Sequence, residues 1–97
     1  MDKRRRIYLA WPSDRFVEAL HLAVEVIRAG HDPLMQTSSA EWSRLDRNRV
    51  EACDCLVRFP GENPKADCAV DCAKVLGLPV YFSLQECLDD LPKRVTA

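Results

Sequence analysis

Two short segments of the chain gather residues that together suit an anionic ligand carrying an aromatic ring. Asn63, followed by a proline, is typical of a helix start, where free N–H groups and the helix dipole favour an anion. Lys65 stands at the second position of that helix, Arg15 begins the helix after the first predicted strand, and Arg58 ends the third strand. Trp11 can stack on a base or narrow a pocket, although packing in a core explains it equally well. These residues predict a site for a phosphate group together with a base.

Four short apolar runs, each followed by a helical pattern, must position these residues. The runs predict buried strands at residues 7–10, 34–36, 55–59 and 79–82. The helical patterns cover residues 14–29, 38–52, 64–76 and 83–92. Capping signals mark their ends, with capping-box spacing at Ser38–Glu41 and Ser83–Glu86 and glycine at positions 30 and 77.

The first predicted helix is amphipathic. Phe16, Leu20, Ala23 and Ile27 fall on one face, and the charged residues fall on another. This spacing is typical of a helix that buries its apolar face in the core.

Strands that alternate with helices through short links predict an α/β fold, a three-layer sandwich with a parallel sheet of four to five strands and helices on both faces. Right-handed crossovers make such a sheet flavodoxin-like or Rossmann-like. The 97 residues form one domain, and residues 1–6 form a basic tail. Ligands bind at the carboxyl ends of the strands in these sheets, which here are residues 10–15 and 59–65.

Composition argues against several classes of function. Lys plus Arg is 14 and Asp plus Glu is 15, which gives a net charge of -1 and no concentrated basic face for duplex DNA. The apolar runs are too short to span a bilayer, and the run after the basic start is too short for a secretory signal. The chain has five cysteines, an odd number, which favours reduced thiols in a cytoplasmic protein.

The cysteines also raise the question of a metal. Cys53 and Cys55 alternate at a strand edge and are predicted to share one side, and Cys68 and Cys72 share one side of a helix. Four thiols can bind zinc, but structural zinc sites place their pairs in tight turns, and free cysteines are commonly buried. We therefore expect neither a metal nor a cofactor.

Three segments resemble a known family. The segment "IYLAWP" at residues 7–12 is similar to a strand and turn that read "IYLAGP" there, and "RAGHDP" at 28–33 is similar to the segment before its second strand. The segment "CDCLVRFPGENPKADCAVDCAKVLGLPVYF" at 53–82 is similar to its closing half. The chain thus resembles the nucleoside 2-deoxyribosyltransferase-like family over residues 7–88, and most closely its short bacterial and phage branch of uncharacterised function.

The resemblance implies cleavage of the N-glycosidic bond of a nucleoside or nucleotide. In active members a glutamate attacks the anomeric carbon or stabilises the oxocarbenium ion, and an aspartate and a tyrosine assist it. By this resemblance the tyrosine is Tyr8 and the aspartate is Asp54. Trp11 and Lys65 replace two glycines of the family, and Asn63 stands roughly at its loop serine or aspartate.

The resemblance places Ala69 at the position of the glutamate. Asp67 and Asp71 cannot replace it, because each lies two residues away and points about 160° around the helix. The residues that share the face of Ala69 include no carboxylate; they are Lys65, Ala66, Cys72 and Ala73. Glu62 in the preceding loop could swing in, so Tyr8, Asp54 and Glu62 remain the catalytic candidates.

These observations predict a protein that binds a nucleotide or an ADP-ribose-type derivative without cleaving it, in a sequestering or sensing role of phage origin. The expected ligand-binding residues are Tyr8, Ala10, Trp11, Pro12, Arg15, Asp54, Arg58, Pro60, Gly61, Asn63, Lys65 and Ala69. Two alternatives stay open. One is an active N-glycosidase or deoxyribosyltransferase, and the other is a protein-interaction module with Trp11 and Trp42 in its contact surface. The resemblance further implies a homodimer or a higher homo-oligomer.

Overall fold

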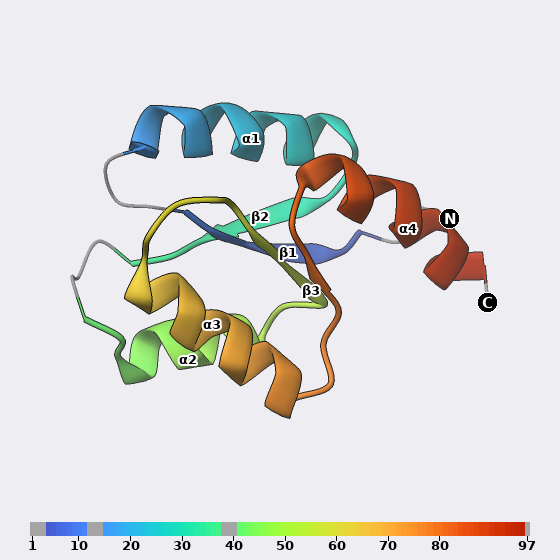
Figure 1. Cartoon of the computed structure of the whole chain (residues 1–97). Helices are drawn as coiled ribbons and strands as arrows, with labels where there is room; N and C mark the ends of the chain where they lie inside the picture. The colour runs from blue at the N-terminus through green and yellow to red at the C-terminus, as the bar shows by residue number, and fades with distance from the viewer. Residues whose placement is uncertain (1–3, 12–14, 38–40, 97) are drawn as a thin grey trace.

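Four parallel strands form one sheet in the computed structural model, which describes residues 4–11, 15–37 and 41–96 (Figure 1). The strand order is β2–β1–β3–β4, and the order reverses between β1 and β3, as in flavodoxin-like sheets. The strands are β1 Arg6–Ala10, β2 Asp32–Met35, β3 Cys55–Arg58 and β4 Val80–Tyr81. The predicted α/β sandwich is confirmed.

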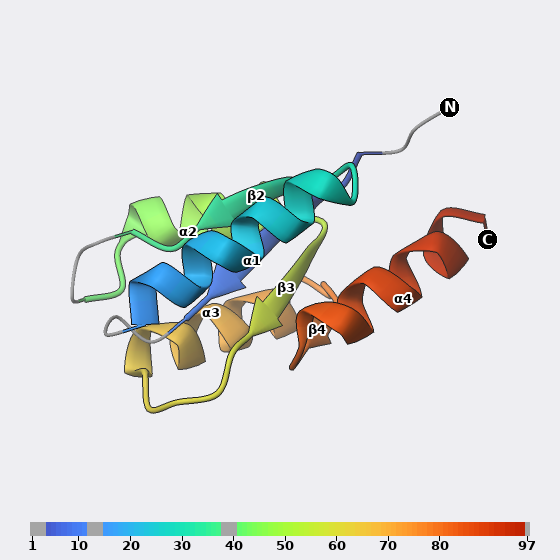
Figure 2. The same ribbon diagram turned by 90° about the horizontal axis from the view of Figure 1, so that it is seen from above.

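Two helices cover each face of the sheet. The helices are α1 Phe16–Arg28, α2 Arg44–Glu51, α3 Pro64–Val75 and α4 Leu84–Thr96. Helices α1 and α4 lie on one face and α2 and α3 on the other, which makes three layers (Figures 1 and 2). No helix among the described residues has the length and apolar character that a bilayer crossing requires.

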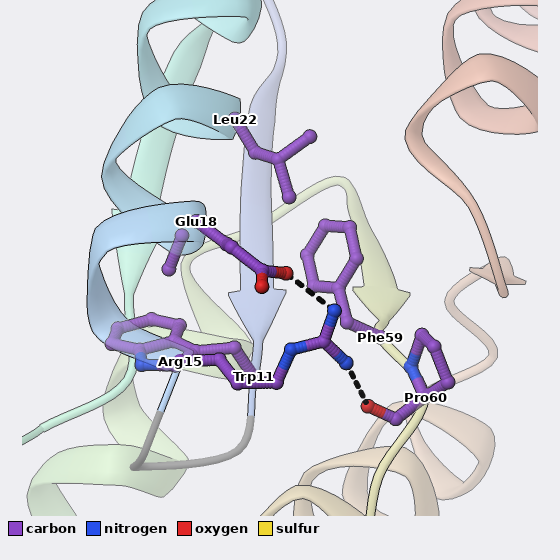
Figure 3. A pocket seen from close by; sticks show the side chains of 7 residues that line it. Trp11, Arg15, Glu18, Leu22, Phe59 and Pro60 are labelled. Carbon is purple, nitrogen blue, oxygen red and sulfur yellow. Dashed lines mark hydrogen bonds and ion pairs between the residues drawn. The ribbon is translucent and has the colours of Figure 1, made fainter.

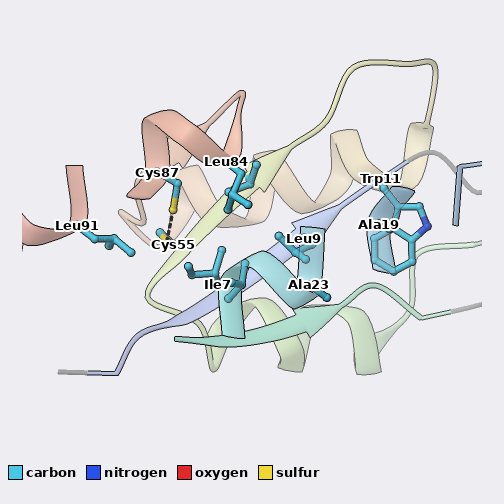
Figure 4. Packing of buried hydrophobic residues seen from close by; sticks show 11 residues of the cluster. Ile7, Leu9, Trp11, Ala19, Ala23, Cys55, Leu84, Cys87 and Leu91 are labelled. Carbon is cyan, nitrogen blue, oxygen red and sulfur yellow. Dashed lines mark hydrogen bonds between the residues drawn. The ribbon is translucent and has the colours of Figure 1, made fainter. Parts of the chain in front are cut away.

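Alternation along β1 divides the core into two layers. Ile7 and Leu9 point toward α1 and α4, whereas Tyr8 and Ala10 point toward α2 and α3, and all four side chains are fully buried. Figure 4 shows the first of these layers. Because β1 is central and buried on both faces, its sequence is a continuous apolar run rather than an alternating one.

Several element boundaries differ from the sequence prediction, those of β2, α2 and α4 among them. β2 begins at Asp32, two residues earlier than predicted. α2 begins at Arg44 because Ser43 and Asp46 form the capping box, in which each side chain accepts a hydrogen bond from the other residue's backbone N–H. The predicted cap at Ser38 lies outside the described residues. α4 continues through residue 92 to Thr96, although the proline there lacks the N–H that a helix interior uses.

The predicted core face of α1 was largely wrong. Ala19, Ala23 and Val26 face the sheet, whereas Phe16 and Ile27 are 52% and 60% exposed. α1 is apolar around most of its circumference, so two faces compete for the core. The face with two alanines lets the helix axis lie close to the sheet, and the bulkier face remains outside.

Candidate functional site

Three adjoining hollows meet at Phe59 and Pro60, where β3 ends. The smallest has a volume of about 40 Å³ and lies between α1 and the end of β1 (Figure 3); its lining comprises Trp11, Arg15, Glu18, Ala19, Leu22, Phe59 and Pro60. The largest, about 580 Å³, runs between α1 and the start of α4. The third, about 320 Å³, adds Arg58, Gly61, Asp67 and Phe82. We call this continuous depression the carboxyl-edge groove, because it lies where β1 and β3 end.

Arg15 spans the groove from α1 to the loop after β3. Its Nη1 donates a hydrogen bond to the carbonyl oxygen of Pro60 at 3.2 Å, and its Nη2 pairs with the carboxylate of Glu18 (Figure 3). The guanidinium therefore holds together two sides of the groove, and Glu18 reaches it because it lies one turn further along α1.

The loop after β3 is held by side-chain contacts at both ends. Arg58 donates hydrogen bonds to the carbonyl oxygens of Phe59 and Gly61, the second at 2.9 Å, and pairs with Asp67 at 3.1 Å. Gly61 has a φ of 126°, a conformation that favours glycine. Asn63 closes the loop: its Oδ1 accepts from the backbone N–H of Ala66 at 3.3 Å, as the predicted N-cap.

Asn63 also ties this loop to β1, because its Nδ2 donates to the carbonyl oxygen of Trp11. Trp11 itself is 6% exposed and belongs to the core between the sheet and α1, where its ring contacts Phe16 at a centroid distance of 6.2 Å. Trp11 thus forms a wall of the groove and does not offer an open face for stacking. The half-buried ring of Phe59 lines all three hollows.

The groove combines an apolar lining with a nearly balanced charge. Its apolar residues include Leu22, Phe59, Phe82, Leu84 and Leu88. Its charged residues are Arg15, Glu18 and Glu25, joined at the far end by the Arg58–Asp67 pair. Both arginines of the groove have a carboxylate partner, which reduces the positive charge that they can offer to a phosphate.

Lys65 departs most clearly from the sequence prediction, because it lies on the other face of the sheet. Its side chain is 3% exposed, and its Nζ lies 3.3 Å from Oδ1 of Asp46, whose side chain is 0% exposed. Its Nζ also donates to the carbonyl oxygen of Thr37 at 2.9 Å. The charge of Lys65 is therefore neutralised inside the protein and joins α3 to the start of α2.

Asp46 remains ionised in this buried setting because it accepts several hydrogen bonds. Burial by itself opposes ionisation, but the hydrogen bonds from Thr37 and Ser43 hold the pKa of Asp46 below its ordinary value. The ion pair with Lys65 acts in the same direction. The buried pair is thus a hydrogen-bonded structural unit.

Tyr8 and Ala69, which the resemblance assigns to one catalytic site, lie in a closed core. Both are 0% exposed and belong to the cluster between the sheet and α2 and α3. The hydroxyl of Tyr8 has no hydrogen-bond partner among the described residues. Burial raises the pKa of Tyr8, and the negative charge of Asp46 raises it further. Ala10, a third predicted ligand residue, is buried in the same cluster.

The remaining catalytic candidates lie apart. The Oδ2 of Asp54 accepts a hydrogen bond at 2.8 Å from the backbone N–H of Arg6, the first residue of β1. Asp54 therefore lies where the strands begin, at the opposite end of the sheet from the groove. Glu62 is exposed in the loop before α3. Asp67 and Asp71 are exposed on α3, away from Ala69, as predicted. Pro12 lies outside the described residues.

The cysteines separate into different layers of the fold. Cys55 and Cys87 are buried between β3 and α4, with their Sγ atoms 3.6 Å apart (Figure 4). Cys53 is buried on the other face, which contradicts its predicted pairing with Cys55, because β3 begins only at Cys55. Burial raises the pKa of Cys53 to about 12. Among the described residues, no three His, Cys, Asp or Glu side chains are grouped as a metal site would require.

Of the predicted ligand residues, the groove therefore keeps Trp11, Arg15, Arg58, Pro60 and Gly61. Sequence reasoning missed its apolar lining, although Phe59 falls within the segment predicted at the end of β3. It also missed Glu18, which could have been found from its spacing of three residues from Arg15, because side chains at that spacing on a helix can pair.

The class that this fold and site define is a small flavodoxin-like α/β domain with a ligand-sized groove at its topological switch point. Comparison of the chain with protein families, with curated proteins and with solved structures found no match.

Proposed function

We propose that the protein binds a nucleotide-derived small molecule in the carboxyl-edge groove and holds it without cleaving it. The observation that carries this proposal is the convergence of three hollows on Phe59 and Pro60, beside the strand ends where parallel sheets bind ligands. The largest hollow, about 580 Å³, falls in the size range of small-molecule sites.

The lining favours the base and sugar of such a ligand over a phosphate. Phe59 and Phe82 offer ring surfaces for an aromatic heterocycle, and Arg15 and Glu18 offer a donor and an acceptor at its edge. Since Glu18 and Glu25 outnumber Arg15 in the main hollow, a multiply charged phosphate would meet no net positive charge there. We therefore expect nucleosides and weakly charged derivatives to bind more tightly than triphosphates.

The position of the candidate catalytic groups supports binding without cleavage. N-glycosidic cleavage needs a carboxylate at the anomeric carbon. Ala69 and Tyr8 are buried on the opposite face of the sheet, and Asp54 lies at the opposite end of the sheet. None of these three residues lines the groove. The carboxylates that do line it are Glu18, Glu25 and Asp67, and each is paired with an arginine. A role in sequestering or sensing a signalling nucleotide, of phage origin, follows from the resemblance and belongs to the same proposal.

The test is a panel of nucleosides, nucleotides and ADP-ribose-type compounds incubated with the full chain. Mass spectrometry after desalting and denaturation reads whether a compound is retained intact, and a thermal shift reads its binding. Arg15→Gln should weaken binding at least about tenfold, since a charge-assisted contact is worth about 1.5–3 kcal/mol. Arg28→Gln is the matched control, because Arg28 makes the same kind of pair on α1, with Glu25, but does not line the groove.

Two outcomes of this test would contradict the proposal. Retention of no compound, with no thermal shift, would refute the binding proposal. Release of free base would show an active glycosidase, and the effect of Glu62→Gln on that release would locate its carboxylate.

One observation favours a second candidate, a protein-interaction module. Phe82 is 62% exposed beside the groove, and Leu84 and Leu88 continue its apolar lining along α4. A groove of this kind also accepts an apolar side chain of a partner protein. On this reading Phe82→Ser abolishes binding of the partner, and the small-molecule panel leaves the melting temperature unchanged. The predicted contact surface at Trp11 and Trp42 is not the basis of this candidate, since Trp11 is buried.

We place this function in the cytoplasm, which is supported by the five free cysteines of the chain. The homo-oligomer implied by the resemblance is likewise part of the proposal.

A further inference from the structure

The outer face of α1 carries five large apolar side chains that nothing in the described structure covers. Their exposed fractions are 52% for Phe16, 64% for Val17, 43% for Leu20, 44% for Val24 and 60% for Ile27. Figure 2 looks down onto α1, and no other element lies over it. Large exposed apolar residues scattered singly are ordinary, but five on one helix form a patch.

The five residues form one continuous stripe along the helix. Leu20, Val24 and Ile27 follow Phe16 and Val17 at spacings of three or four residues, which places all five on one side of α1, whose 13 residues span about 20 Å. The polar residues of α1 lie on a separate side, where Glu18 and Glu25 face the groove. The stripe and the groove therefore occupy different sides of the same helix, and covering the stripe leaves the groove open.

We infer that a second copy of this chain covers the stripe, with its own α1 packed antiparallel across a two-fold axis. In that arrangement Phe16 of one copy meets Ile27 of the other, and Leu20 meets Val24. The stripe is thus its own complement, as a two-fold interface requires. None of its five residues is charged, so no ion has to leave water when the two copies meet.

The area of the stripe suits a reversible dimer. Half-exposed side chains of this size contribute on the order of 80 Å² each, so the stripe covers about 400 Å². Two copies with their flanking residues then bury on the order of 1,000 Å², at the lower end of specific protein–protein interfaces. We expect a dissociation constant of about 1–100 µM for such an area.

Sedimentation equilibrium of the full chain tests the inference. The unaltered chain should dimerise in the micromolar range, and Leu20→Glu should weaken dimerisation at least about 100-fold, because it buries an unpaired carboxylate between the copies. Val75→Glu is the matched control, since Val75 is 85% exposed on α3, away from the stripe. Unchanged circular dichroism and unfolding midpoints, measured below the dissociation constant where the unaltered chain is monomeric, would show that both variants are folded. An unaltered chain that remains monomeric at about 500 µM would overturn the inference, and so would a Leu20→Glu chain that dimerises normally.

Cross-linking tests the antiparallel arrangement. Cysteines introduced as Leu20→Cys and as Val24→Cys, each in a Cys68→Ser chain, should form a disulfide between the two chains when mixed. Each chain alone should cross-link far less. Preferential cross-linking of each variant with itself would refute the antiparallel axis.

Discussion

The buried ion pair between Asp46 and Lys65 makes a quantitative prediction. Asp46→Asn leaves the ammonium of Lys65 without a carboxylate in a site where the two side chains are 0% and 3% exposed. Removing one partner of a buried pair costs about 3–5 kcal/mol, because the remaining charge cannot return to water. Glu51→Gln is the control: it breaks the exposed pair with Arg47, at 3.9 Å, and should cost at most about 1 kcal/mol.

Urea unfolding at pH 7 measures both variants. With an m-value of about 1.5 kcal/mol/M, the expected loss moves the midpoint of Asp46→Asn down by about 2–3 M. The pKa of Asp46 is lowered in the folded state, so its carboxylate stabilises the fold above its ordinary pKa, and this contribution is lost as the pH falls through the lowered value. The difference between the unaltered chain and Asp46→Asn should therefore shrink in acid.

Two results would refute this reasoning. The first is an Asp46→Asn chain no less stable than Glu51→Gln. The second concerns the double variant Asp46→Asn, Lys65→Met. Because Lys65 lies away from the groove, adding Lys65→Met should restore part of the stability lost in Asp46→Asn and leave binding in the groove unchanged. Loss of binding in the double variant Asp46→Asn, Lys65→Met, with its stability restored, would return Lys65 to the ligand site that the sequence predicted.

Three further predictions concern single side chains. Ala69→Glu should lower the unfolding free energy by about 3–5 kcal/mol at pH 7. The loss should be smaller at pH 5, because burial raises the pKa of the new carboxyl. The control Cys68→Glu, on the exposed side of α3, should lower the unfolding free energy by at most about 0.5 kcal/mol. Equal urea midpoints for these two variants would contradict the closed core at position 69. Tyr8→Phe should leave the urea midpoint unchanged or raise the unfolding free energy by up to about 2 kcal/mol, since the hydroxyl is unpartnered among the described residues, and a clear loss would disprove this. Burial and then the charge of Arg5 lower the pKa of His31 from its ordinary value of 6.5. The unfolding free energy should therefore decrease as the pH falls below 6.5, more steeply than in His31→Gln. Parallel pH profiles of the two chains would argue against this prediction.

Local signals in the sequence predicted most of the fold. The apolar run of β1 and the capping of α3 by Asn63 depend on neighbouring residues alone, and both predictions are confirmed. The start of α2 was misplaced because Ser38 with Glu41 and Ser43 with Asp46 offer competing capping boxes five residues apart. Only the packing of Asp46 against Lys65 and Thr37 distinguishes them.

The site was predicted less well, because it depends on which face of the sheet each residue meets. Trp11 and Arg15 follow the end of β1 and Arg58 ends β3, and their place at the groove was predictable from the topology. Lys65 stands beside Asn63 in sequence, yet the turn of α3 carries it to the opposite face. Its partner Asp46 is 19 residues away in the chain, a separation at which the spacing of residues carries no signal.

Pro33 has a consequence for how the folded chain meets other chains. The backbone N–H of Asp32 donates to the carbonyl of Arg5 at 2.8 Å, so alternation turns the backbone nitrogen of position 33 toward the open edge of the sheet. A proline there offers no hydrogen to an incoming strand, and β4 at the other edge has only two residues. Both edges of the sheet are thus poor templates for strand addition, which protects the folded chain against edge-to-edge aggregation.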